Sequence, residues 1–221
     1  MDRHATFLRD IPAEFLENCL IGLFEDYLAS AEFCSDRFEV TEAVNVLPFF
    51  RRGMIEARLR ENSTKHRAMK CVCEPDESGF WNHTVITAGD CMLTQSTARS
   101  AGAPIRSSHA RLAYAEPDNQ KYLHDSFKPL TPSRKGFIYG ILAHGRMAGE
   151  KFFPAFAQIV FPKRNLDGYH PRPIDLFAMF PETVRRCTSG IFEERHGTLE
   201  RHFEHIDLPD PQLRDDIEAV G

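Results

Sequence analysis

The sequence predicts an α+β protein in which N-terminal helices pack on a mainly antiparallel β-sheet and a short helix follows near the C-terminus. Apolar residues recur with a helical period through residues 12–60, and beyond residue 66 short apolar runs separated by turn sequences replace that period. Helices followed by a run of strands are typical of the α+β class. We expect residues 1–221 to form a single domain, with a helical part at 1–65 and a sheet-rich part at 66–221.

The first predicted helix covers residues 12–31, where apolar side chains at i, i+3 and i+4 spacing form a broad stripe. Asp10 is its expected N-cap, and Pro12 suits the first turn, where a missing backbone N–H leaves no hydrogen bond unmade. The side opposite the stripe is expected to face solvent because it carries four acidic residues, Glu14, Glu17, Glu25 and Asp26.

A second helix is predicted from residue 41 to residue 60, on a weaker apolar period. Pro48 falls inside it and is expected to kink or split the helix, because proline lacks the backbone N–H and its ring crowds the preceding turn. The stretch "RRGMIEARLREN" is expected to form a charged outer face, with Glu56 and Arg60 in i, i+4 contact.

The strand predictions follow from apolar runs bounded by turn sequences. "AMKCVCE" and "FWNHTVITAG" are predicted to form an antiparallel hairpin, and "CMLTQST" the next strand. "KGFIYGILAHG" and "PAFAQIVFP" are apolar on both faces and joined by a short segment, so they should be central antiparallel neighbours.

The remaining segments carry weaker patterns. Residues 98–110 are expected to form a loop, "RLAYAE" a short strand, and residues 117–135 irregular structure. "PIDLFAMF" fits a strand or a short helix, and a last helix is expected from Leu199 to Ile206, beyond a break at Gly197.

The composition is that of a globular protein, with 42% hydrophobic and 27% charged residues and 18 phenylalanines that should be largely buried. No apolar run approaches the roughly 18 residues of a membrane span, and the N-terminus resembles neither a secretory signal nor a transit peptide. We therefore expect a cytoplasmic protein that does not enter a membrane. Its six cysteines form no C-x-x-C pair and are expected to be reduced.

The formal charge of −5 is unevenly distributed along the chain. Residues 91–149 contain eight basic and three acidic residues, a net charge of +5, and no acid stands between Asp90 and Glu116. From Glu193 to Glu218 nine acids stand against three arginines, a net charge of −6. The basic segment indicates either an anion-binding loop or a solvated loop that balances the acidic C-terminal part.

A binding role is predicted for the basic loop because arginine forks and nearby hydroxyls suit phosphate oxygens. His144 ends the strongest apolar strand, and we expect it at the lip of a site or where the strand meets solvent. The candidate anion- or partner-binding residues are Arg99, Arg106, His109, Arg111 and His144.

Catalytic and metal-binding patterns are weak in this sequence, so no catalytic residue is assigned and no metal or cofactor is expected. The cluster "HGTLERHFEH" places its glutamates and its later histidines on different helix flanks, which does not favour a metal site. A Cys91–His83 nucleophile pair and a carboxylate cluster are weaker alternatives; the acids available at strand ends are Glu74, Asp76, Asp90 and Asp175.

Three functions are compatible with these patterns. The first is an interaction or regulatory protein that binds an acidic or phosphate-bearing partner through the basic Ser/Thr/Arg-rich loop. The second is a hydrolase or nuclease-like enzyme acting on a phosphate-bearing or nucleic-acid substrate; nucleic acid is less favoured because the pI is near 6.1. The third is a small-molecule protein with a phenylalanine-lined pocket. The sequence does not indicate an oligomeric state.

Overall fold

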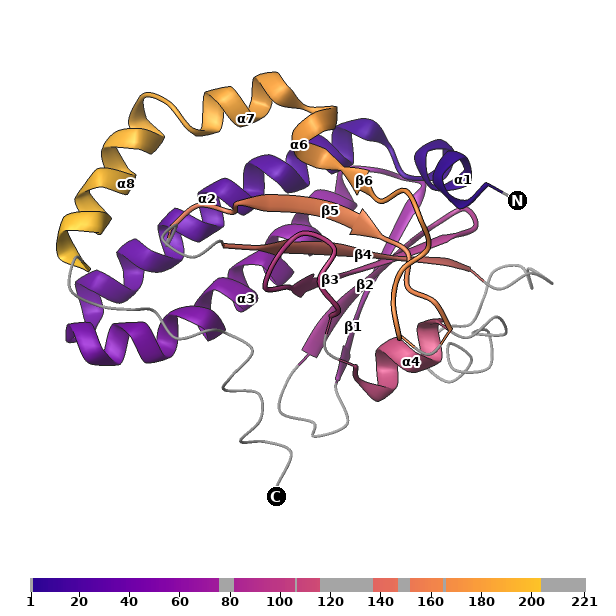
Figure 1. Ribbon diagram of the computed structural model, residues 1–221, viewed down its shortest axis with the longest axis horizontal. Coiled ribbons are helices and arrows are strands. Elements are labelled where there is room, and N and C mark those ends of the chain that lie inside the picture. The colour runs from indigo at the N-terminus through magenta and orange to yellow at the C-terminus, as the bar shows by residue number, and fades with distance from the viewer. Residues whose placement is uncertain are drawn as a thin grey trace.

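The computed structural model describes residues 2–75, 82–105, 107–115, 137–146, 152–164 and 166–203, except the side chain of His109 (Figure 1). The helices are α1 (Arg3–Asp10), α2 (Ala13–Arg37), α3 (Val40–Thr64), α4 (His109–Ala115), α6 (Leu176–Met179), α7 (Pro181–Cys187) and α8 (Ile191–His202). The strands are β1 (Met69–Pro75), β2 (Asn82–Ala88), β3 (Cys91–Thr97), β4 (Ile138–Gly145), β5 (Phe156–Val160) and β6 (Ile174–Asp175).

The predicted fold class is confirmed: N-terminal helices pack against a mostly antiparallel sheet, and short helices follow near the C-terminus. The strands lie side by side in the order of the sequence, β1-β2-β3-β4-β5-β6. The predicted β1–β2 hairpin and the antiparallel β4–β5 pair are both present. Strands β3 and β4 are parallel, which the sequence did not predict, so the chain crosses over the sheet between Thr97 and Ile138.

Helices α2 and α3 lie side by side along one face of the sheet, and α6, α7 and α8 continue in an arc beside α2 (Figure 1). The apolar stripe predicted for α2 is buried between α2 and the sheet. Of the 16 described phenylalanines seven are buried, eight are partly buried and Phe33 is exposed. This side of the core includes Phe7, Phe15, Leu20, Phe24, Ile86, Leu93, Leu142 and Ile159.

The opposite face of the sheet carries a second cluster of buried residues, to which the β3–β4 crossover contributes Ile105 and Tyr114. "RLAYAE" lies here and was predicted as a strand, but residues up to Ala115 belong to helix α4. Tyr114 packs edge-on against Tyr139 with 5.5 Å between ring centres, so α4 is held by a contact far away in the sequence. Residues 117–135 and Trp81 lie outside the described residues.

Two predictions about the first helix are wrong. Asp10 ends α1 and does not cap α2; its Oδ2 accepts a hydrogen bond from the backbone N–H of Asp90 at 2.9 Å, and Pro12 occupies the N-cap position of α2. Asp26 does not face solvent, because α3 covers it, and it pairs with Arg58 at 3.0 Å with 2% of its surface exposed. Burial raises the pKa of Asp26.

Helix α3 continues across Pro48, so the predicted split is absent. Val44 and Leu47 pack against α2, and Ile55 and Leu59 pack into the core below, so burial on both sides of Pro48 compensates for the missing backbone hydrogen bond. The predicted charged outer face is wrong for Arg51 and Glu56, which are 9% and 5% exposed.

The C-terminal helix begins earlier than predicted, at Ile191, and runs through Gly197 without a break. Leu199 and Phe203 are buried, as their spacing indicated, and pack against Phe152 and the end of α2. Ile206 and His205 lie outside the described residues. Among the helices that the structure describes, none combines the length and the apolar character needed to cross a membrane.

Candidate functional site

The parallel arrangement of β3 and β4 brings their carboxyl ends together at one end of the sheet. The backbone N–H of Ala98 donates to the carbonyl of His144 at 2.8 Å, just after β3 ends. Gly145 permits this close approach, because a Cβ atom at this position would lie 2.1 Å from the carbonyl oxygen of Ala98. Arg99 and Arg146 therefore leave the sheet from neighbouring strand ends.

A buried chain of hydrogen bonds runs below these strand ends, between the helices and the sheet. The Tyr27 hydroxyl lies 3.0 Å from Nδ1 of His144, and Nε2 of His144 lies 3.0 Å from Oε1 of Gln95. Nε2 of Gln95 donates to Oε1 of Glu56 at 2.7 Å, and the backbone N–H of Thr84 donates to Oε2 of Glu56 at 2.7 Å. The chain thus joins α2, β4, β3, α3 and β2.

The carboxylate at one end fixes the direction of every bond in this chain. Because Glu56 only accepts, the Gln95 amide must present its nitrogen to Glu56 and its oxygen to His144. His144 therefore carries its proton on Nε2 and accepts from the Tyr27 hydroxyl at Nδ1. Each donor in the chain meets an acceptor, so the polar groups are buried without leaving an unmade bond among them.

His144 is neutral at pH 7. It is 1% exposed, and burial together with the nearby positive charge of Arg51 lowers its pKa to about 3. The guanidinium carbon of Arg51 lies 4.0 Å from the centre of the Tyr27 ring, which is a cation–π contact. A neutral His144 avoids placing a second cation in this interior.

We call five arginines on α3, on α4 and just after β3 and β4 the arginine rim: Arg51, Arg52, Arg99, Arg111 and Arg146. Arg51 and Arg146 are close enough that the charge of Arg146 contributes to the lowered pKa of Arg51, after burial as the main cause. Arg52 acts in the same way on Arg111, whose pKa is lowered chiefly by burial. Like charges therefore lie near each other from α3 and the end of β4, and from α3 and α4.

A second polar cluster lies on the opposite face of the sheet, beneath α4. The Tyr114 hydroxyl donates to Glu74 in a short hydrogen bond, and Nε2 of His83 lies 3.0 Å from the same hydroxyl. Burial lowers the pKa of His83, and Arg111 and Arg52 also contribute to this lowering. Glu74 and His83 are paired across β1 and β2, so Tyr114 anchors α4 to the first hairpin.

The residues predicted to bind an anion are only partly brought together. Arg99 is exposed just after β3, and Arg111 is half-buried on α4 near Tyr139. His144 is buried below the strand ends and does not form the lip of a site. Arg106 lies outside the described residues; His109 begins α4, and its side chain is likewise not described.

The sequence did not identify Tyr27, Arg51, Glu56 or Gln95 as site residues. One signal was present: Gln95 and His144 each continue the apolar face of a strand, two residues after Leu93 and Leu142. A polar residue on a face that is otherwise buried needs a buried partner. The partners could not be found from the sequence, because they lie on helices far away in the chain.

The alternative chemistries are not assembled in the described residues. Cys91 and His83 project to opposite faces of the sheet, and Cys91 lies next to Asp10, with its pKa raised to about 12 mainly by burial. Among the strand-end acids, Glu74 binds Tyr114, Asp90 pairs with Arg9, and Asp175 caps α6. Asp76 lies outside the described residues.

The histidines of α8 are engaged with aromatic and acidic neighbours. His196 stacks on Phe153 with 4.5 Å between ring centres, and its Nδ1 lies 3.7 Å from Glu200. His202 packs edge-on against Phe203. Within the part of the chain that the structure describes, no three His, Cys, Asp or Glu side chains converge to hold a metal ion.

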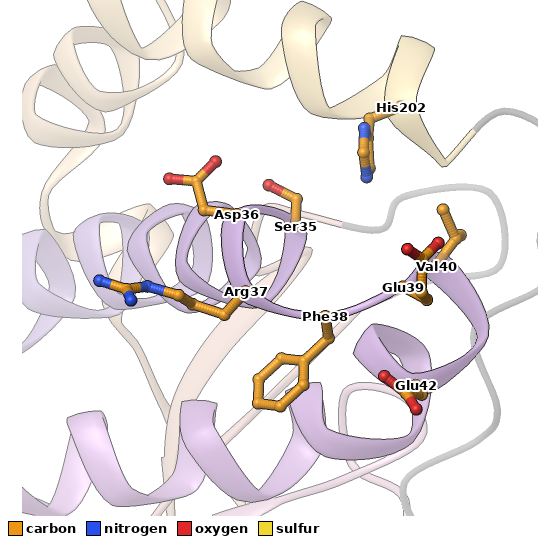
Figure 2. Close-up of a pocket in the computed structure, with 8 residues that line it drawn as sticks. All are labelled: Ser35, Asp36, Arg37, Phe38, Glu39, Val40, Glu42 and His202. Carbon is orange, nitrogen blue, oxygen red and sulfur yellow. The ribbon is translucent and has the colours of Figure 1, made fainter.

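A surface pocket of about 420 Å³ lies at the α2–α3 turn, where the last turn of α8 faces it (Figure 2). Its lining includes the acids Asp36, Glu39 and Glu42, with Arg37 and His202 beside them. An excess of carboxylates does not favour a phosphate group, so this pocket does not share the chemistry of the arginine rim.

Compared with known proteins, the chain matches no family model, no curated protein and no solved structure. Its function is therefore inferred from the placement of its own side chains.

Proposed function

We propose that the protein binds an acidic or phosphate-bearing partner through the arginine rim, with the buried Tyr27–His144–Gln95–Glu56 chain holding the rim in place. The observation that carries the proposal is the meeting of the β3 and β4 ends at Ala98 and Gly145, from which Arg99 and Arg146 leave the sheet side by side. The charge of Arg146 also acts on Arg51, and that of Arg52 on Arg111. Guanidinium groups that lie near one another suit the several oxygens of a phosphate group.

The buried chain supports this role by fixing the base of the rim. Arg51 lies against the Tyr27 ring, and Tyr27 is held by His144, so the guanidinium has a defined position. A guanidinium that is already ordered loses less conformational entropy when it binds a phosphate. Arg111 is placed near Tyr139 in the same way from the other face of the sheet.

The test uses inorganic pyrophosphate as the first probe, because it presents a compact array of phosphate oxygens. Pyrophosphate should raise the melting temperature, since a ligand that binds only the folded state stabilises it by about 2.7 kcal/mol at 100 times its Kd. The variants Arg52→Gln and Arg146→Gln should each weaken binding about tenfold or more, as measured by calorimetry.

The matched control is Arg185→Gln, which removes an equally charged residue from α7. Arg185 pairs with Glu182 on the surface, and its side chain is 73% exposed. Pyrophosphate binding should be unchanged in this variant. The proposal fails if pyrophosphate does not bind, or if all three variants lose the same affinity.

A second probe distinguishes the kind of partner. A short single-stranded oligonucleotide that binds with a steep loss of affinity as salt rises, and that competes with pyrophosphate, would identify the partner as a nucleic acid. Pyrophosphate binding without oligonucleotide binding would identify a smaller phosphate-bearing or acidic partner.

A further inference from the structure

Strand β1 forms one edge of the sheet. It pairs along its length with β2, and among the described strands none lies on its other side. A seven-residue edge strand presents backbone N–H and C=O groups that can pair with another strand. The pairing capacity of this edge is not explained by the proposed function.

The sequence of β1, "MKCVCEP", is complementary to itself in one antiparallel register. If two copies pair about a two-fold axis through Val72, Lys70 of each copy lies opposite Glu74 of the other. The same register places Cys71 opposite Cys73. Opposite charges facing each other across an antiparallel pair are stabilising, and like charges are destabilising.

The neighbouring registers lack this match. A two-fold axis through Cys71 would place Lys70 opposite Val72, and an axis through Cys73 would place Glu74 opposite Val72. Register in a strand pair is set by such side-chain pairs. The charge pattern therefore selects the axis through Val72.

We propose that two copies of this chain associate through antiparallel pairing of their β1 strands about Val72, which joins the two sheets into one. The interface is isologous, as expected for a two-fold dimer. Pro75 ends the paired segment, because proline cannot donate a ladder hydrogen bond. The paired strands are short, so the dimer is expected to be weak and dependent on concentration.

The surroundings of the charged pair are compatible with this arrangement. Lys70 is exposed, and Glu74 uses Oε2 for its contacts with Tyr114 and His83. The Glu74 side chain is 16% exposed, and the proposed pairing places Lys70 of the second copy opposite it. Cys73 is exposed beside Arg60, and Cys71 is half-buried.

The two cysteines give a test that is specific for the register. Cys71→Ser and Cys73→Ser chains are prepared separately, so that each retains one of the two thiols and no bond can form between them within a chain. Diamide is added as the oxidant; it takes two electrons and two protons from a thiol pair and leaves a disulfide. The other four cysteines, Cys19, Cys34, Cys91 and Cys187, are buried.

Neither chain alone should form a disulfide-linked dimer, whereas their mixture should. In the proposed register a thiol lies opposite a serine in each homodimer, but opposite a thiol in the mixed dimer. The reaction is run near pH 8.5, because burial raises the pKa of Cys71 and only the thiolate reacts. No linked dimer in the mixture, or equal linking in the separate chains, would overturn the proposal.

The charges give an independent test by sedimentation. Lys70→Glu should weaken self-association about tenfold or more, because the substituted glutamate of each copy then faces Glu74 of the other. Mixing this variant with a Glu74→Lys chain should restore association. In the mixed dimer each glutamate of the first chain lies opposite a lysine of the second. The control Lys65→Glu makes the same charge change at the C-cap of α3, outside β1, and should leave association unchanged. Equal behaviour of the Lys70 and Lys65 variants contradicts the proposal.

Discussion

The Tyr27 hydroxyl lies 3.0 Å from Nδ1 of His144, and this contact joins α2 to β4 across 117 positions of the sequence. The same histidine reaches β3 through Gln95, so one imidazole connects the helix layer to two parallel strands. Because both ring nitrogens are used inside the protein, the protonation of His144 is coupled to folding.

Replacing His144 should change how stability depends on pH. In the folded protein the pKa of His144 is lowered to about 3, from an ordinary value of 6.5, so the unfolded chain binds a proton that the folded chain does not. The contribution of His144 to the free energy of unfolding is therefore fully present above pH 6.5 and is lost as pH falls toward 3. The loss approaches about 1.4 kcal/mol per pH unit.

His144→Gln removes this titration and retains a side chain able to form hydrogen bonds. In urea unfolding, the variant should be about 1–3 kcal/mol less stable than the native chain at pH 7.5. The difference should shrink as pH falls from 6.5 to 5, because the native chain loses stability that the variant never had. A difference that stays constant over this range would contradict the assignment of a neutral, buried His144.

Glu56→Gln should destabilise the fold by about 2–3 kcal/mol, because the new amide nitrogen must face one of two donors, the Thr84 N–H or Nε2 of Gln95. Glu61→Gln is the matched control on the same helix. Glu61 forms an exposed i, i+4 pair with Lys65, and its loss should cost less than about 0.5 kcal/mol. Equal costs in chemical denaturation would show that Glu56 is not the acceptor that closes the chain.

Gly89→Ala should cost more stability than Gly102→Ala, although both glycines have a positive φ, +52° and +74°. A Cβ atom at Gly89 would lie 2.5 Å from Oδ2 of Asp10, which accepts the Asp90 N–H, whereas nothing lies within 4 Å of a Cβ atom at Gly102. We expect about 1 kcal/mol for Gly102→Ala from backbone strain alone. Gly89→Ala should cost about 2–4 kcal/mol in thermal unfolding, because the clash with Asp10 adds to the strain. A similar cost for both would remove the proposed role of Asp10.

Gly53→Ala should stabilise the protein by about 0.5–1 kcal/mol, because alanine lowers the conformational entropy of the unfolded chain without strain in the helix. Gly53 is exposed in the interior of α3, and a Cβ atom there would meet nothing within 4 Å. A loss of stability in urea unfolding would show that this face of α3 is in contact with another part of the molecule.

Helices and strands with a strong local pattern were predicted well from the sequence. The stripe of α2 and the strands β1 to β5 were recognised because their apolar periods directly reflect which face is buried. "RLAYAE" was predicted as a strand because a short apolar run does not distinguish a helix from a strand. In the fold its residues up to Ala115 are helical, and Tyr114 packs on Tyr139. Asp26 and Glu56 were predicted to face solvent because acidic residues usually do. In the fold Asp26 is paired with Arg58 of α3, and Glu56, itself on α3, accepts from the backbone N–H of Thr84.

The sequence by itself determined the order of helices and strands, the class of the fold and the basic character of the segment that carries Arg99 and Arg111. The parallel pairing of β3 and β4, and with it the meeting of their carboxyl ends, depended on the tertiary structure. So did the role of His144, which the sequence placed at an edge and the fold buries between Tyr27 and Gln95. The physical reason is that local periodicity reports which face of an element is buried, whereas a buried polar side chain takes its meaning from a partner that only long-range packing supplies.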